Sequence, residues 1–139
     1  MIKVHIENEF QNSIDIDVKW INLICNTILN DNNNVCAKIT IIFSDDERLY
    51  NLKRNFFGED LFTDVITFNL EEQGENIEGE IYISIDRVYD NAIKYKQKFD
   101  MEIKRIIIHG CLHLIGYNDK TIKEKKQMTS LEDYYLINT

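Results

Sequence analysis

The chain has 139 residues, of which 44% are hydrophobic and 29% are charged, and its formal net charge is −8. These values are typical of one soluble globular domain spanning residues 1–139, and no apolar run approaches the roughly 20 residues that a membrane-spanning helix requires. Three widely spaced cysteines do not favour a disulfide framework, and the first residues lack the pattern of a signal peptide. We therefore expect a cytoplasmic protein that does not interact with membranes.

The charge is distributed unevenly along the chain. Residues 87–126 contain ten basic and five acidic residues, a net charge of +5, whereas the rest contains six basic and nineteen acidic residues, a net charge of −13. A basic region can bind a polyanion even when the whole protein is acidic. The same pattern is also typical of solvated helix faces, so charge alone leaves nucleic-acid binding open.

Hydrophobic patterning predicts alternating strands and helices in the first part of the chain. Alternation over residues 2–6 predicts a strand, and a helical apolar stripe over residues 15–30 predicts a helix. The β-branched run at residues 38–43 predicts a buried strand. Ser44 to Glu47 form an N-cap with a glutamate at the third helical position, which predicts a helix from about residue 45 to residue 56.

The second half begins with two strands and continues as helices. Strands are predicted at residues 64–68 and 80–85, followed by a helix at residues 88–99, a helix capped by Asp100 that runs to about residue 114, and a last helix at about residues 120–137. This order predicts an α/β or α+β fold, with a small mixed sheet of about four strands covered by helices.

The most informative stretch is centred on two histidines. His109 and His113 are four residues apart on a predicted helix, so their imidazoles project from one face and can bind one ion. Gly116 permits a sharp turn that brings Asp119 back toward them. Two imidazoles and a carboxylate suit Zn²⁺ and leave a fourth position open for water.

Other residues limit the choice of metalloenzyme. In zinc peptidases a glutamate directly follows the first histidine and acts as general base, but Gly110 occupies that position here. The third histidine, His5, lies on the first predicted strand and is expected to be an ordinary surface or core residue. Two histidines can also fall at helical spacing by chance, so the glycine turn and the following carboxylate are what favour a metal site.

The same stretch resembles a motif of the YbeY family of endoribonucleases and rRNA maturation factors. Residues 109–119, His-Gly-Cys-Leu-His-Leu-Ile-Gly-Tyr-Asn-Asp, are similar to the family's His-Gly-x-Leu-His-Leu-x-Gly-Tyr-Asp-His. Residues 60–68, Asp-Leu-Phe-Thr-Asp-Val-Ile-Thr-Phe, are similar to its Asp-x-x-Thr-Asp-Val-Leu-Ser-Phe, and Gly79-Glu80-Ile81 to its Gly-Asp-Ile. The resemblance extends over about residues 35–135 and implies a metal helix like that of zinc hydrolases.

Besides Asn118, which stands for an aspartate of the motif, two departures from the family pattern bear on the site. Asp119 replaces the third histidine, which keeps a ligand in place, and Gly-Tyr-Asn-Asp-Lys at residues 116–120 matches a form that a branch of the family is expected to have. Phe57 stands where the family usually has an arginine that is thought to contact phosphate. Lys53 or Arg54, one helical turn earlier, could reach the same space and take over that catalytic role, or could belong to a solvated helix face.

The resemblance implies a zinc-dependent endoribonuclease that cleaves single-stranded RNA during 16S rRNA maturation and ribosome quality control. One Zn²⁺ per chain is expected at His109, His113 and Asp119, and proteins of the small ribosomal subunit are candidate partners. No residue is a clear general base. Base stacking is a candidate role for Tyr117, Phe57 or Phe62, although packing around the metal helix is the favoured explanation for these aromatic residues. The candidates for contacts to the RNA backbone are Lys104, Arg105 and Lys120.

Two alternative functions remain open. The protein could be a non-catalytic ribosome-assembly factor with a structural zinc, which the missing arginine favours. It could also be a zinc hydrolase acting on peptides or amides, which the glycine at position 110 disfavours.

Overall fold

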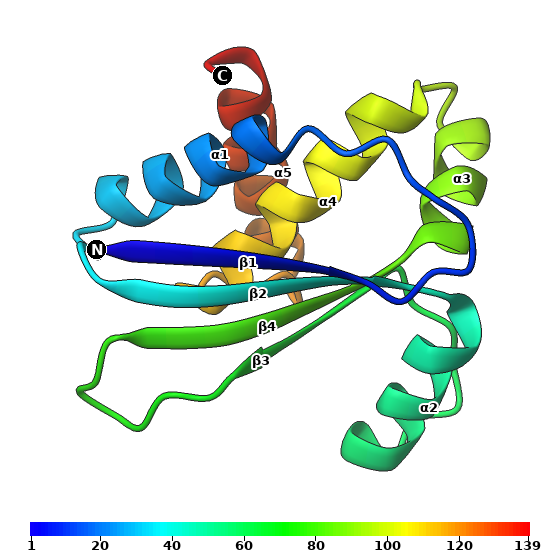
Figure 1. The fold of residues 1–139 in the computed structure, drawn as a ribbon, viewed down its shortest axis with the longest axis horizontal. Coiled ribbons are helices and arrows are strands. Elements are labelled where there is room, and N and C mark those ends of the chain that lie inside the picture. The colour runs from blue at the N-terminus through cyan, green and yellow to red at the C-terminus, as the bar shows by residue number, and fades with distance from the viewer.

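The computed structural model describes all of residues 1–139 and contains four strands and five helices (Figure 1). In chain order these are β1 (Ile2–Asn8), α1 (Val18–Asp31), β2 (Ala37–Ser44), α2 (Asp46–Phe57), β3 (Val65–Asn69), β4 (Ile77–Ser84), α3 (Ile85–Lys94), α4 (Phe99–Leu114) and α5 (Ile122–Ile137). None of the helices is both long and apolar enough to cross a membrane.

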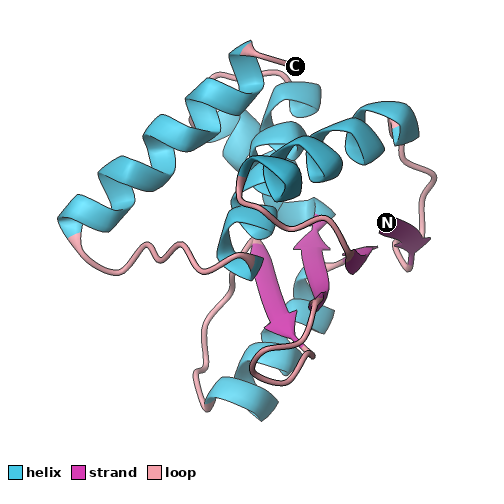
Figure 2. Ribbon diagram, turned by 90° about the vertical axis from the view of Figure 1, so that its left-hand side faces the viewer, coloured by secondary structure: helices cyan, strands magenta, loops and turns pink.

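The four strands form one mixed sheet in the order β1-β2-β4-β3. β1 pairs with β2 and β2 with β4 in parallel, whereas β3 pairs with β4 in the antiparallel direction. The predicted fold class, a small mixed sheet covered by helices, is therefore confirmed. Figure 2 shows helices gathered above the strands and a separate helix below them.

Alternating residues of β4 face two separate hydrophobic clusters, as the two-residue period of a strand requires. Ile81 and Ile83 belong to the main core of 22 buried residues, which α1, α4 and α5 share with the sheet. Tyr82 packs on the opposite face against a small cluster formed by α2 and β3. The metal helix α4 therefore lies on one face of the sheet and α2 on the other, with the β3 edge between them.

Gly110 lets α4 approach β4 closely. A Cβ atom at this position would lie 2.7 Å from Cγ2 of Ile81, a buried strand residue, and real Cβ atoms essentially never make so short a contact. Position 110 thus faces the sheet. No side chain at this position can act as the general base that zinc peptidases place after their first histidine.

We predict that Gly110→Ala destabilises the protein by about 1–2 kcal/mol, because the cost of overpacking exceeds the gain in helix propensity. Urea unfolding of wild type and variant measures the difference. Ser130→Ala, at an exposed position of α5, is the control for propensity alone. A variant as stable as wild type would show that α4 can shift away from β4 at no cost.

The helices before the metal site differ from the sequence prediction. α3 begins at Ile85 and not at residue 88, since the Ser84 hydroxyl accepts a hydrogen bond from the Arg87 amide. Asp100 was predicted to cap the next helix, and this was wrong. Lys98 is the N-cap residue of α4, without a side-chain hydrogen bond, and Asp100 forms an ion pair with Lys104 at 3.3 Å.

Candidate metal centre

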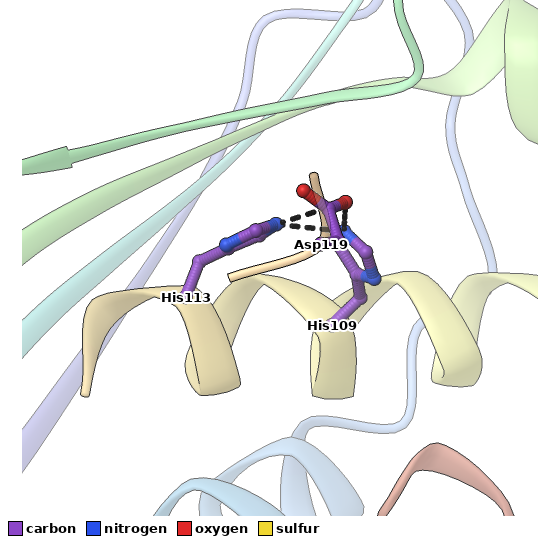
Figure 3. A group of neighbouring side chains, drawn as sticks. All are labelled: His109, His113 and Asp119. Atoms are coloured by element: carbon purple, nitrogen blue, oxygen red, sulfur yellow. Dashed lines mark hydrogen bonds and ion pairs between the residues drawn. The ribbon is translucent and has the colours of Figure 1, made fainter. Parts of the chain in front are cut away.

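Two histidines of α4 and one aspartate of the following loop converge on one point (Figure 3). His109 and His113 lie one turn apart on the same face of α4. The helix ends at Leu114. Two residues later Gly116 has a φ of 107°, in the left-handed region that favours glycine, and its amide donates to the His113 carbonyl oxygen at 3.0 Å. This turn directs the chain back so that Asp119 faces both imidazoles.

The donor atoms are separated as a tetrahedral ion would require. The two Nε2 atoms lie 2.9 Å apart, and Oδ2 of Asp119 lies 3.3 Å from His109 Nε2 and 3.4 Å from His113 Nε2. Metal–ligand bonds of about 2.0–2.1 Å in tetrahedral geometry place donor atoms about 3.3 Å apart. His109, His113 and Asp119, the triad hereafter, therefore fit a small divalent cation.

Hydrogen bonds behind the imidazoles orient them for this task. His109 Nδ1 lies 2.7 Å from Oε2 of Glu132 on α5, and His113 Nδ1 lies 2.9 Å from the Tyr117 carbonyl oxygen. When each Nδ1–H donates to its oxygen acceptor, each Nε2 presents a lone pair toward the ion, as is usual for metal-binding histidines. Glu132, whose spacing from Met128 in the last helix is part of the resemblance to the family but to which the sequence assigned no role, is a positioning residue of the site.

A model of the family described as Endoribonuclease YbeY matches residues 5–139. The chain belongs to the YbeY family. It is 41% identical over 134 residues to "Endoribonuclease YbeY" of Karelsulcia muelleri, covering 96% of this chain and 88% of that protein. It is 39% identical over 133 residues to the protein of the same name from Flavobacterium psychrophilum, covering 96% and 92%.

A solution structure of a Thermotoga maritima protein has a similar fold. The TM-score is 0.66 at 28% sequence identity, and the match covers 96% of this chain and 86% of that one. The resemblance to the YbeY family that the sequence motifs indicated is thus confirmed over nearly the whole chain.

The two imidazoles of this YbeY protein differ in proton affinity. Burial lowers the pKa of His109, but the hydrogen bond and charge of Glu132, with the charges of Asp119 and Asp64, outweigh it and raise that pKa above its ordinary value. Burial and the neighbouring His109 lower the pKa of His113. A metal ion needs the lone pair of each Nε2, so protons compete with the ion more strongly at His109 than at His113.

Two cavities adjoin the triad and share four lining residues: Asp64, which directly precedes β3, Val65, His109 and Asp119. The first, of about 290 Å³, is lined by Lys53, Phe57 and Thr63 together with all three triad residues, and we name it the Lys53 cavity. The second, of about 280 Å³, is lined by Glu102, Arg105, Glu132, His109 and Asp119, and we name it the Glu102 cavity.

The two residues predicted to replace the family arginine lie in different places. Lys53 lines the Lys53 cavity, with Nζ 4.8 Å from the centre of the Phe57 ring. Arg54 is exposed and pairs with Asp60 at 3.7 Å, and it does not line that cavity. Successive helix residues point about 100° apart, which is why only one of the pair faces the triad.

The three candidate RNA contacts are also separated by the fold. Arg105 donates to Glu132 at 2.9 Å and to Asp133 at 2.7 Å, so it braces the residue that orients His109. Lys104 lies over the Trp20 ring at 5.1 Å, away from the triad. Lys120 is exposed directly after Asp119.

Of the three aromatic candidates for base stacking, only Phe57 lines a cavity at the triad. Its side chain is 46% exposed and stacks on Phe68 with ring centres 5.9 Å apart. Phe62 packs against Tyr50 at 4.9 Å, and Tyr117 packs against the main core. Phe57, at the position of the family arginine, is therefore a partly exposed aromatic ring beside the triad, with Lys53 over it.

Proposed function

We propose that this YbeY protein is a zinc-dependent endoribonuclease that cleaves single-stranded RNA. The observation that supports this most strongly is the triad, whose two imidazoles and one carboxylate form an open, three-ligand site of the kind that catalytic zinc uses. A bound zinc ion would polarise a phosphoryl oxygen or lower the pKa of a bound water to about 7. Relatives at about 40% identity are named Endoribonuclease YbeY, which agrees with this activity.

The protein's own residues supply the substrate contacts. In the Lys53 cavity the ammonium group of Lys53 would attract a backbone phosphate, and the partly exposed ring of Phe57 would stack an unpaired base. Bases in a duplex are already stacked on one another, so this arrangement favours single strands. Glu132 contacts His109 and Arg105 holds Glu132, so these two residues fix the orientation of His109.

We further propose that the substrate is ribosomal RNA, within 16S rRNA maturation and ribosome quality control in the cytoplasm. The small ribosomal subunit and its proteins are then the partners. This part of the proposal rests on the family and on the similarity of the motifs at residues 60–68 and 109–119.

Cleavage of labelled RNA tests the proposed activity. Zinc-loaded protein should cleave a single-stranded oligonucleotide, leave the same sequence in a perfect duplex intact, lose activity after chelation and regain it when zinc is added back. The variant His113→Ala, purified in the same way, controls for contaminating ribonucleases. Equal cleavage by wild type and this variant would contradict the proposal.

A second candidate is a ribosome-assembly factor in which zinc has only a structural role. The specific observation in its favour is that Phe57 occupies the position of the family arginine. Lys53 is therefore the one lysine or arginine side chain that lines the Lys53 cavity. This function predicts that zinc-loaded protein binds small subunits but cleaves no RNA. Activity against peptides is disfavoured by the placement of Gly110 against Ile81.

We predict that Lys53→Ala weakens binding of single-stranded RNA and reduces the slope of log affinity against log salt by about 0.7, the value for one lost phosphate contact. Zinc content should not change. Arg54→Ala is the matched control, since it removes an equal charge from the adjacent position outside the cavity. The affinity for single-stranded RNA, measured at several salt concentrations, distinguishes Lys53→Ala from Arg54→Ala. Identical slopes for both variants would mean that neither residue contacts RNA specifically.

A further inference from the structure

The Glu102 cavity is rich in carboxylates that the proposed zinc site does not fully use. Four acidic side chains line it, those of Asp64, Glu102, Asp119 and Glu132, and the basic side chains there are Arg105 and the triad residue His109. Asp119 belongs to the triad, and Glu132 contacts His109 and Arg105. Asp64 and Glu102 are the two acidic residues without a role in the zinc site.

Glu102 is the most unusual of these residues because it is buried without a partner. It is only 6% exposed, and its carboxylate forms no hydrogen bond and no ion pair. No fully enclosed side-chain oxygen or nitrogen in the structure lacks a partner. The carboxylate oxygens of Glu102 must therefore reach the open space of the cavity that the residue lines.

The basic side chains of the cavity already have other partners, since His109 belongs to the triad and contacts Glu132. Arg105 is already paired with Glu132 at 2.9 Å and with Asp133 at 2.7 Å. The Asp64 carboxylate accepts hydrogen bonds from neutral groups, the Asn91 side-chain amide of α3 at 3.1 Å and the backbone amides of residues 64 and 65, and its charged neighbour is the triad residue His109. Burial, Asp64 and Glu132 together raise the pKa of Glu102 against the opposing effect of Arg105, and burial raises the pKa of Asp64.

We propose that the Glu102 cavity binds a second divalent cation, of the Mg²⁺ or Mn²⁺ class, through the carboxylates of Asp64 and Glu102. Every uncommitted donor there is an oxygen, which suits hard cations, whereas the imidazoles of the triad select zinc. Mg²⁺ commonly keeps several waters and uses only one or two carboxylates, and about 280 Å³ is enough space for such a hydrated ion.

The second cation would change how the cavity meets an anionic ligand. Without it, the carboxylates of Asp64 and Glu102 repel any phosphate that approaches the triad from this side. With it, the two cavities that adjoin the triad both attract phosphate, one through Lys53 and the other through the bound ion. The site itself does not depend on whether the protein cleaves RNA.

Binding of Mn²⁺ to zinc-loaded protein tests the proposal directly. Electron paramagnetic resonance of free Mn²⁺ should report one bound Mn²⁺ per chain, which excess Mg²⁺ displaces, while elemental analysis shows zinc unchanged. Glu102→Gln, which keeps the shape of the side chain, should weaken Mn²⁺ binding at least tenfold, and so should Asp64→Asn. Glu59→Gln, at an exposed position of the loop after α2, should bind as wild type does.

Three results would overturn the proposal. The first is no bound Mn²⁺ in zinc-loaded wild type at millimolar concentration. The second is displacement of zinc in proportion to the Mn²⁺ bound, which would place Mn²⁺ in the triad. The third is equal Mn²⁺ affinity in wild type and Asp64→Asn, a variant that remains informative even if Glu102→Gln fails to fold. RNA cleavage is not measured, so an inactive protein would leave this test intact.

Discussion

Replacement of His113 by alanine should remove the bound zinc and reduce RNA cleavage to background. The variant keeps only His109 and Asp119 as ligands, and two ligands hold Zn²⁺ far more weakly than three, by at least a hundredfold in affinity. Elemental analysis of freshly purified protein gives zinc per chain. His5→Ala is the matched control, because His5 is exposed on β1, and full zinc occupancy in His113→Ala would refute the ligand assignment.

Asp119→His completes this experiment. An imidazole nitrogen and a carboxylate oxygen bind zinc at nearly the same distance of about 2.0–2.1 Å. The substitution restores the third histidine that the family motif usually has, so zinc content should stay close to one per chain. Loss of zinc in this variant would show that the loop after Gly116 has adapted its path to the shorter aspartate side chain.

Glu132→Gln should weaken zinc binding by roughly 10–100-fold at pH 8, the range found when the partner of a metal-binding histidine is altered. The negative charge of Glu132 makes His109 a stronger ligand through the 2.7 Å contact to Nδ1. Competition titrations with a zinc chelator measure the affinity. Asp133→Asn is the matched control, because it removes the other partner of Arg105 without touching His109.

The pH dependence of this effect distinguishes a positioning role from simple misfolding. Glu132 raises the pKa of His109, so in wild type protons compete with zinc for His109 at higher pH than in Glu132→Gln. The affinity of wild type should therefore fall earlier as pH is lowered. The zinc affinity of wild type divided by that of Glu132→Gln should be largest at high pH and should decrease toward pH 6. A ratio that stays constant with pH would contradict the role assigned to Glu132.

The fold class and the triad followed from the sequence because both depend on local geometry. Residues four apart share a helix face whatever surrounds the helix, and a glycine just past the helix end permits the turn that returns Asp119. Strands and helices were recognisable because alternation and helical spacing of apolar residues reflect which side is buried. The sheet order and the direction of β3 came only from the structure.

The exact helix starts were decided by tertiary contacts. Ser44 was predicted within the N-cap of α2, but Ser44 continues β2 in register with Ser84 of β4. The cap is Asp45, whose carboxylate accepts a hydrogen bond from the Arg48 amide. Strand pairing across the sheet thus fixed a boundary that several polar residues in a row left ambiguous.

The surroundings of the triad could not be predicted from the sequence. Glu132 is 23 residues from His109, and α5 has no clear apolar stripe to show which of its faces meets α4. For the same reason Arg105, which charge alone predicted to bind RNA, lies between two carboxylates of α5. Spacing along one helix determines which residues share a face, but only packing between helices determines which partner each of them finds.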